Sequence, residues 1–437
     1  MAGAALALVM ASPAFANTSH VTQNNTSQTA IVDQASGNRG SSDIEQSGNG
    51  NVATVEQSDT ATSSFGAPAR NSSDIYQNGT ANNADVEQFN TGAGAATVNA
   101  SSIDQAGSDA SAYVFQSGTG NSSSIDQSAV GAELANVKQT GADNTAVVDQ
   151  LGTGGSVYID QGYSSGNSQG SSADVEQTGA NGLVFVDQTG NSHLAIVTQG
   201  GVSNEVEIGQ SGDNNIANAS QSGTSSIVQI TQIGTALGNS AFVQQTGNFS
   251  LFGTFQSGSG NIIGQGGPFV QSANSSIASL EQIGTGNRIN GSQGGSANLL
   301  TVNQQDLNQL ANVNQSGSGH RMDVRQSAAS NQANLTQSGT NNDIFLVQSG
   351  SANLSTVLQS GSGNDLFIDQ FGGNNEVSVN QSGTNGLIDI NQTTSGAYAE
   401  VNQSGGAGNQ AFITQGSTDA IGIITQVGAS NYASINQ

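Results

Sequence analysis

Glutamine is the residue whose spacing is most regular in this sequence. Its amide carries two N–H donors and one oxygen acceptor, so the chemistry available to it is hydrogen bonding rather than proton or electron transfer. One series of glutamines begins at Gln23, Gln34 and Gln46 and reaches Gln437 through gaps that are mostly eleven residues long. Identical amides that lie above one another at strand spacing bond to each other, so the series predicts a ladder of stacked amides.

The residues between two glutamines follow a shared pattern. Counting from each glutamine, Gly is common at the second position, Asn at the fifth, a small or apolar residue at the seventh, and a branched aliphatic residue at the ninth. The unit that ends at Gln370 has Gly361, Asn364, Leu366 and Ile368 at these positions. The ninth position holds Val, Ile or Leu in all but four units, where it is Ala219, Thr254, Phe269 or Gly291.

An extended strand is the element that brings these positions together. Side chains two residues apart point to the same face of a strand, so the fifth, seventh, ninth and eleventh positions share one face. We expect that face to be the interior, and the intervening positions, rich in Asp, Glu, Thr and Asn, to meet solvent. Ser-Gly or Thr-Gly after the glutamine is typical of a turn, because Gly allows positive φ. Gly, Asn, Ser and Thr at this density form helices poorly.

Insertions in the repeat indicate that two units make one coil. The five longest gaps follow Gln57, Gln88, Gln161, Gln232 and Gln256, and all five come after even-numbered units. This parity favours a strand–turn–strand coil, twice the glutamine spacing in length, with its insertions at one edge. The sequence therefore predicts an all-β fold: an amyloid-like β-solenoid of about 18 two-strand coils with roughly 22 residues per coil, over residues 17–437.

We expect the ladder to consist of the glutamines and the fifth-position asparagines, packed beside the aliphatic residues. The predicted structural ladder positions are Gln139, Asn144, Gln150, Gln337, Asn342, Gln348, Gln359, Asn364, Ile368, Gln370, Gln426, Asn431 and Gln437. Because Gln437 closes a full unit, we expect the last strand to offer its N–H and C=O groups to another chain. End-to-end addition of copies into a homopolymer follows from that expectation.

The composition excludes several classes of function. The chain has 31 acidic and 6 basic side chains and a formal charge of −25, whereas nucleic-acid binding requires a basic surface. The absence of Cys excludes disulfides, thiolate zinc sites and cysteine nucleophiles. His193 and His320 both occupy the fifth position, so we interpret them as substituted ladder residues rather than metal ligands or general bases. We predict no catalytic site, cofactor or metal, and hence no enzyme.

Acidic residues often directly precede a glutamine of the series. They are Asp33, Glu45, Glu56, Glu87, Asp104, Asp126, Asp149, Asp160, Glu176, Asp187, Glu281 and Asp369. In one interpretation these carboxylates form a solvated face that slows premature aggregation. In the other, acid or divalent cations relieve their mutual repulsion and speed assembly. Outward Phe115, Phe255, Phe345 and Phe367 are either lateral contacts between copies or ordinary surface aromatics.

Residues 1–16 have features of a secretory signal. Met1 to Met10 are almost wholly apolar, and Ala14 and Ala16 are small residues suited to a cleavage site after Ala16. The apolar run is too short to cross a bilayer, and no other stretch approaches the ~20 apolar residues of a membrane helix. We therefore expect an exported protein, secreted or at the cell surface, without a membrane span.

The spacing Gln-x-Gly-x-x-Asn-x-Ala-x-x-x-Gln resembles the curlin repeat of bacterial curli subunits. It runs from Gln139 through Gly141, Asn144 and Ala146 to Gln150, and it recurs at the end of the sequence. The resemblance covers essentially all of residues 17–437. It implies a secreted β-solenoid that polymerises into extracellular amyloid fibres of the biofilm matrix, with a nucleator subunit and an outer-membrane export pore as partners.

Three functional interpretations remain at this point. The first is a structural subunit of curli-like fibres that serve adhesion and the biofilm matrix. The second is a monomeric β-solenoid acting as a surface adhesin or ice-binding rod, although ice binding needs a regular Thr array and the outward positions here are mixed. The third is intrinsic disorder, which fits the Gly, Ser, Asn and Gln bias but leaves the aliphatic residues in register unexplained.

Overall fold

The computed structural model describes residues 9–10, 17–35, 40–59, 71–90, 98–162 and 168–437. The contacts divide the chain into two units, Met1–Ser222 (unit 1) and Gly223–Gln437 (unit 2). The predicted signal segment 1–16 lies outside the described residues except for a short strand at Val9–Met10. Every regular element in the described part of the chain is a β-strand, which confirms the predicted all-β class.

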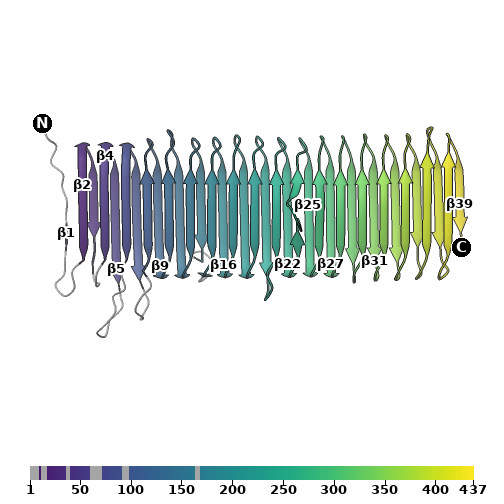
Figure 1. Cartoon of the computed structure of the whole chain (residues 1–437), viewed down its shortest axis with the longest axis horizontal. Helices are drawn as coiled ribbons and strands as arrows, with labels where there is room; N and C mark the ends of the chain where they lie inside the picture. Colours follow the sequence, from purple (N-terminus) through teal and green to yellow (C-terminus); the bar gives the residue numbers. More distant parts are fainter. Residues whose placement is uncertain (1–8, 11–16, 36–39, 60–70, 91–97, 163–167) are drawn as a thin grey trace. The chain divides into compact units, whose positions relative to one another are not determined.

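Unit 1 is built from two parallel sheets, which we name sheet A and sheet B, and successive strands alternate between them except for β13 and β14, which both lie in sheet A (Figure 1). Sheet A contains β1 (Val9–Met10), β3 (Thr29–Asp33), β5 (Val52–Asp59), β7 (Asn83–Asn90), β9 (Ser111–Thr119), β11 (Leu134–Ala142), β13 (Ser156–Gln161), β14 (Ser168–Gln169), β16 (Leu183–Asn191) and β18 (Glu205–Asp213). Sheet B contains β2 (Thr18–Thr26), β4 (Ser41–Asn49), β6 (Ser72–Thr80), β8 (Ala100–Gln105), β10 (Ser122–Gln127), β12 (Thr145–Gln150), β15 (Ser172–Gln177), β17 (Leu194–Gln199) and β19 (Ile216–Gln221).

Unit 2 repeats this arrangement, and we use the same two sheet names. Sheet A contains β20 (Ile227–Gly234), β22 (Leu251–Ser259), β25 (Ile277–Thr285), β27 (Leu299–Leu307), β29 (Arg321–Ser327), β31 (Asp343–Ser349), β33 (Asp365–Phe371), β35 (Leu387–Gln392), β37 (Gln410–Gln415) and β39 (Tyr432–Asn436). Sheet B contains β21 (Ser240–Gln245), β23 (Ile262–Ile263), β24 (Phe269–Gln271), β26 (Arg288–Gln293), β28 (Leu310–Gln315), β30 (Gln332–Gln337), β32 (Leu354–Gln359), β34 (Glu376–Gln381), β36 (Tyr398–Ser404) and β38 (Ile421–Val427).

Each strand pairs in parallel with the strand one coil further along, and the register places equivalent residues side by side. Between β31 and β33, Leu346 lies opposite Ile368 and Gln348 lies opposite Gln370. A coil is therefore one strand of each sheet, and the chain holds about 18 coils of roughly 22 residues, which confirms the predicted solenoid. Insertions do not change the register between paired strands. Gln57 and Gln88, for example, lie opposite each other although the connection between their strands is longer.

The interior lies between the two sheets and takes every second side chain. In β33, Leu366, Ile368 and Gln370 are buried, whereas the alternating Asp365 and Phe367 are exposed. The burial pattern thus follows the period of two that the sequence predicted for the fifth, seventh, ninth and eleventh positions.

The core compensates for its irregular positions across neighbouring coils. Phe269 lies opposite Gly291, because the paired strands β24 and β26 place Val270 beside Ser292. The Phe269 ring packs 5.4 Å from the ring of Phe252, and both rings are fully buried. Large aromatic residues therefore fill the space that a glycine leaves, as close packing requires.

One predicted insertion is wrong in its position. The connections after Gln57, Gln88 and Gln232 leave a strand of sheet A for sheet B, at one edge, as expected, and the one after Gln161 leads to the short strand β14 of sheet A before the chain enters sheet B. The long gap after Gln256 does not lie at that edge. It instead splits a strand of sheet B into β23 and β24, because the extra residues follow Ile263. Glutamine spacing reports the length of an insertion but not where the chain bulges.

Glycine at the second position is required by the close stacking of the turns. Gly361 has a φ of +92°, and a Cβ added to it would lie 2.0 Å from the carbonyl oxygen of Gly383 in the next coil. A side chain at this position would therefore separate the coils as well as strain the backbone.

Shortening a core residue should destabilise the protein far more than shortening an outward one. Ile368 is 1% exposed, so Ile368→Ala should lower the free energy of unfolding by about 2–5 kcal/mol through lost burial and a cavity. Leu358 is 47% exposed, so Leu358→Ala should change it by less than ~0.5 kcal/mol. Denaturant unfolding followed by circular dichroism measures both values. Equal effects of the two substitutions would contradict the assignment of faces.

Candidate functional site

The glutamine side chains form continuous hydrogen-bond ladders along each sheet. Gln337 Nε2 donates to Gln359 Oε1 at 2.8 Å, and Gln359 Nε2 donates to Gln381 Oε1 at 2.9 Å, all in sheet B. In sheet A, Gln348 Nε2 donates to Gln370 Oε1 at 2.8 Å. Most of these side chains are fully buried. Consecutive glutamines of the series thus belong to different ladders. The partner of each glutamine is the one in the next coil, not the next one in the sequence.

The second N–H of the glutamine amide ties the two sheets together. Gln139 Nε2, at the end of its sheet A strand, donates to the backbone oxygen of Ser122 in sheet B at 2.9 Å. Gln150, in sheet B, makes the reciprocal bond to the backbone oxygen of Leu134 in sheet A at 3.2 Å. Both donors and the oxygen are therefore satisfied inside the core, where an unpaired amide group is costly.

Asparagines directly before the strands form a second set of ladders at the turns, and we name their position the Asn slot. Asn342 Nδ2 donates to the backbone oxygens of Ser338, at 2.7 Å, and of Gly361 in the next coil, at 3.2 Å. Its Oδ1 accepts the backbone N–H of Asn364, the next slot residue, at 2.9 Å. An asparagine in the slot therefore donates to two carbonyls and accepts from the following coil.

The remaining predicted ladder residues occupy these positions, with differences near the C-terminus. Asn144 accepts a hydrogen bond from the backbone N–H of Ser171 at 3.1 Å, which follows the slot pattern. Ile368 lies in the apolar core beside the glutamines and belongs to no polar ladder. Gln426 accepts from Gln403 Nε2 at 2.9 Å. Asn431 donates its backbone N–H and its Nδ2 to Asn409 Oδ1, at 3.0 and 3.1 Å. Gln437 is exposed.

Of the two buried histidines, His193 reproduces the bonds of asparagine in the slot, and His320 reproduces the acceptor bond, since its Nε2 has no hydrogen-bond partner. His193 Nε2 lies 3.0 Å from the backbone oxygen of Thr189, and its Nδ1 accepts the backbone N–H of Asn215 at 3.3 Å. His320 Nδ1 likewise accepts from the backbone N–H of Asn342 at 3.2 Å. Burial lowers the pKa of both imidazoles, so they remain neutral and keep one acceptor nitrogen. They are ladder residues, as the sequence indicated.

Two longer residues in the Asn slot were missed by sequence reasoning. Gln309 makes the bonds of an asparagine: its Nε2 donates to the backbone oxygen of Gln305 at 3.0 Å and its Oε1 accepts from Asn331. Glu133 occupies the slot before β11 with a carboxyl group. A single-residue insertion after Gln127 shifts Glu133 from the fifth place to the sixth, and only counting back from the next glutamine would have found it.

The predicted acidic residues separate onto two outer faces. In unit 1, Asp104, Asp126, Asp149 and Glu176 lie on successive strands of sheet B, each opposite the next. Partial burial raises the pKa of the Asp104, Asp126 and Asp149 carboxyls, and the carboxylates on neighbouring strands raise it further for Asp126 and Asp149. The stacking register thus forces like charges together.

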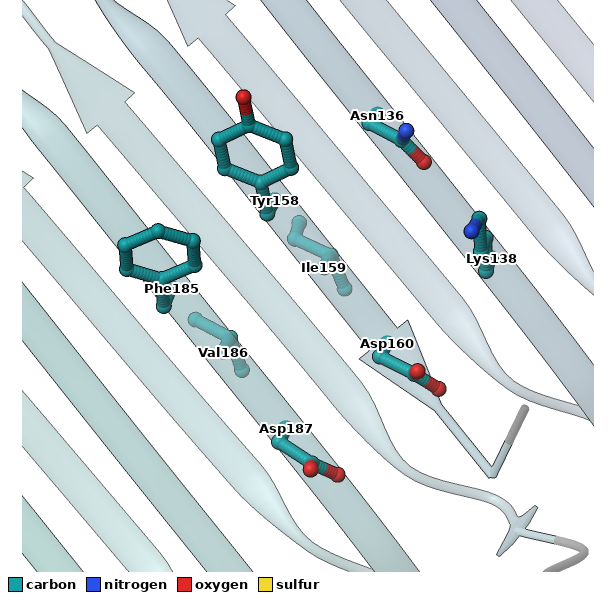
Figure 2. A pocket seen from close by; sticks show the side chains of 8 residues that line it. All are labelled: Asn136, Lys138, Tyr158, Ile159, Asp160, Phe185, Val186 and Asp187. Atoms are coloured by element: carbon teal, nitrogen blue, oxygen red, sulfur yellow. The ribbon is translucent and has the colours of Figure 1, made fainter. Parts of the chain in front are cut away.

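A shallow hollow on the outer face of sheet A in unit 1 has a volume of about 220 Å³ (Figure 2). The rings of Tyr158 on β13 and Phe185 on β16 stack with centroids 5.0 Å apart, and Asp160 and Asp187 lie further along the same strands. This alignment is the same register that stacks the glutamines. The hollow thus follows from the stacking of equivalent residues on neighbouring strands.

The outward aromatic residues contact one another along the sheets. Phe345 and Phe367 stack with ring centroids 5.1 Å apart, and Phe115 lies 5.7 Å from Phe89. Within the described ranges, no group of three His, Cys, Asp or Glu side chains is placed to hold a metal ion. No helix in that same part of the chain is long and apolar enough to cross a membrane.

Removing one buried glutamine should destabilise the protein strongly. Gln359→Ala leaves the donor of Gln337 and the oxygen of Gln381 without their partner, at ~1–3 kcal/mol for each group. We therefore expect a loss of about 2–6 kcal/mol in the free energy of unfolding. The exposed Gln332 on the outer face of β30 is the matched control, and Gln332→Ala should change that value by less than ~0.5 kcal/mol. Denaturant titration gives the free energy of unfolding of both variants, and equal values would contradict a stabilising role of the buried glutamine.

Mild acid should stabilise unit 1. Because the folded-state pKa of Asp104, Asp126 and Asp149 is raised, the folded protein binds more protons than the unfolded chain, and stability is lost as the pH rises through these pKa values. The unfolding midpoint should therefore increase between pH 7 and pH 4, by a smaller amount in Asp126→Asn and at high salt. A midpoint that falls on acidification would contradict the carboxylate arrangement.

Comparison with known proteins agrees with this geometry. The chain matches the family of the curlin associated repeat over residues 169–201, 201–234 and 339–372. No curated protein gave a significant match. Each matched stretch is about three glutamine spacings long, so it covers strands of both sheets and their ladders. These three matches support the assignment of the chain to the curlin-repeat family.

Proposed function

We propose that this protein is a structural subunit of extracellular, curli-like amyloid fibres that serve the biofilm matrix and adhesion, and that it assembles by stacking of coils. The observation that carries the proposal is that the same kinds of bond join successive coils along the chain. In both units successive coils are joined by a parallel backbone ladder, and most of them also by a Gln–Gln amide bond and by Asn-slot bonds. These bonds are as available to a coil of a second copy as to the next coil of the same chain.

The backbone pattern of β39 supports addition at an axial face. Gln410 N–H donates to Asn431 oxygen, and Gln437 N–H donates to Thr414 oxygen, so odd-numbered residues of this segment bond towards β37. In a parallel ladder the alternate residues point to the opposite side, and Ser434 is one of these. In a protein of residues 17–437, this side of β39 offers a row of donors and acceptors to an incoming strand.

The family and the fold are structural rather than catalytic. Family members are extracellular fibre proteins, which supports secretion of this chain, with residues 1–16 as its signal. Export through an outer-membrane pore and initiation by a nucleator subunit are parts of the same proposal. Repulsion among the outward carboxylates would oppose association, and acid or divalent cations would then speed it.

Purified residues 17–437 should convert to fibres on incubation. We expect thioflavin T fluorescence to rise with a lag that seeds abolish, unbranched fibres in electron micrographs, and a fibre diffraction spacing of ~4.7–4.8 Å from stacked strands. Persistent single particles without these signals would count against a fibre subunit and favour the monomeric adhesin.

A proline in the outermost strand tests the axial face. Ser434→Pro removes one N–H donor on the side of β39 that faces away from β37, where proline is tolerated at a sheet edge. Seeded elongation should slow at least about tenfold, because the incoming strand loses a ladder bond and meets the proline ring. Ser434→Ala keeps the N–H and is the matched control. Equal elongation rates for the two variants, with unchanged circular dichroism, would exclude growth at this face.

A further inference from the structure

Glu133 is the buried carboxyl group that the ladder does not explain. It is 1% exposed, and neither of its side-chain oxygens has a hydrogen-bond partner. The residues at the same position in the adjoining coils are Ala110 and Gly155, which carry no polar side chain. A buried acceptor without a donor is costly, and an unpaired buried charge is costlier still.

The bonds of the Asn slot define what a residue must supply there. By the pattern of Asn342, an occupant donates to the carbonyl four residues earlier and to a carbonyl nineteen residues later. The first of these residues directly follows a glutamine, and it does so even where the turn is longer, since Asn239 donates to the oxygen of Ile233. For Glu133 the two positions are therefore Ser128 and Gly152. Gln309 shows that a side chain of this length reaches such partners, because its Nε2 donates to Gln305 oxygen and to Ala328 oxygen at 2.6 Å. A carboxylate has no donor to offer, whereas a carboxylic acid has one.

The surrounding charges also oppose ionisation of Glu133. In sheet B, Asp126 and Asp149 are the next-to-last residues of β10 and β12, and the turn before β9 carries Asp109. Lys138 lies on the outer face of β11 and faces away from the slot. The Asp126 carboxylate acts on Glu133 directly. The slot is thus bounded by acidic groups, carbonyl oxygens and small residues.

We propose that Glu133 is a proton-controlled lock among the Asn-slot residues of unit 1. As a carboxylic acid its side chain keeps the coil folded at this turn, and loss of the proton lets the coil unfold locally. The lock concerns the folded chain itself and does not depend on fibre formation. Its effect is confined to the coils of β9, β11 and β13, because the slot bonds reach only the neighbouring coils.

The direction of the pH effect follows from the pKa. Burial, with the nearby Asp126 carboxylate, raises the pKa of Glu133 from 4.5 to about 7. Between these values the folded coil holds a proton that the open coil releases, so stability falls as the pH rises from about 4.5 to about 7 and is constant above. A pKa increase of this size corresponds to an equilibrium constant for local opening that increases by up to about 300-fold over that pH range.

Two reciprocal substitutions test the lock by hydrogen exchange and mass spectrometry of the purified protein. Glu133→Gln places a permanent donor in the slot. Peptides covering β11 should exchange at the wild-type rate at pH 4.5 but at least about tenfold more slowly than wild type at pH 8. Comparison at equal pH removes the intrinsic pH dependence of exchange. Glu45→Gln, on the exposed outer face of β4, makes the same chemical change without burial and should leave these peptides unchanged.

Gln309→Glu should install the same lock in unit 2. Peptides covering β28 should then exchange normally at pH 4.5 and at least about tenfold faster than wild type at pH 8, in low and high salt alike. The proposal is overturned if either variant differs from wild type by a factor that is independent of pH, or if Glu133→Gln does not fold. It is also overturned if calcium at pH 8 restores protection in wild type alone, because the carboxylate would then bind a metal ion rather than a proton.

Discussion

A buried primary amide must find partners for two N–H groups and one oxygen, and leaving any of them unpaired costs on the order of 1–3 kcal/mol. In this protein most core glutamines meet that requirement with an identical residue one coil away and a backbone oxygen of the opposite sheet. A shift of one strand by a single residue would move the glutamine to the outer face and leave its neighbours unpaired. The ladders therefore fix the register of every coil, and the aliphatic residues pack within that frame.

The same constraint explains which substitutions the chain tolerates. The Asn slot accepts His193 and Gln309 because each supplies an acceptor towards the next coil, in bonds like those of asparagine. At Ser250, the hydroxyl donates to Ala273 oxygen at 2.6 Å and accepts the backbone N–H of Ser276. Glu133 differs because the ionised form of its side chain cannot donate, so what it contributes depends on protonation.

Stacking by identical bonds links the fold to assembly. Since the coils within the chain are held by backbone ladders that repeat in every coil and by amide ladders that repeat in most, an outermost coil carries the same unsatisfied backbone pattern as an inner one would if exposed. The outer faces are under no such constraint, which is why Tyr158, Phe185 and the carboxylates vary from strand to strand. Where like charges coincide, as at Asp104 and Asp126, the register imposes a repulsion that the ladders outweigh.

The sequence by itself determined the strand as the repeating element, the inward and outward faces, and the coil of two units. These follow from periods of two and eleven residues, which are local properties of the chain. Most ladder positions, such as Gln139 and Asn342, could be named for the same reason. Only the tertiary structure decided that the insertion after Gln256 bulges within a strand, and that the Glu133 carboxyl has no partner. Both depend on what the neighbouring coils place beside a residue, and residues from different coils meet only when the chain has folded.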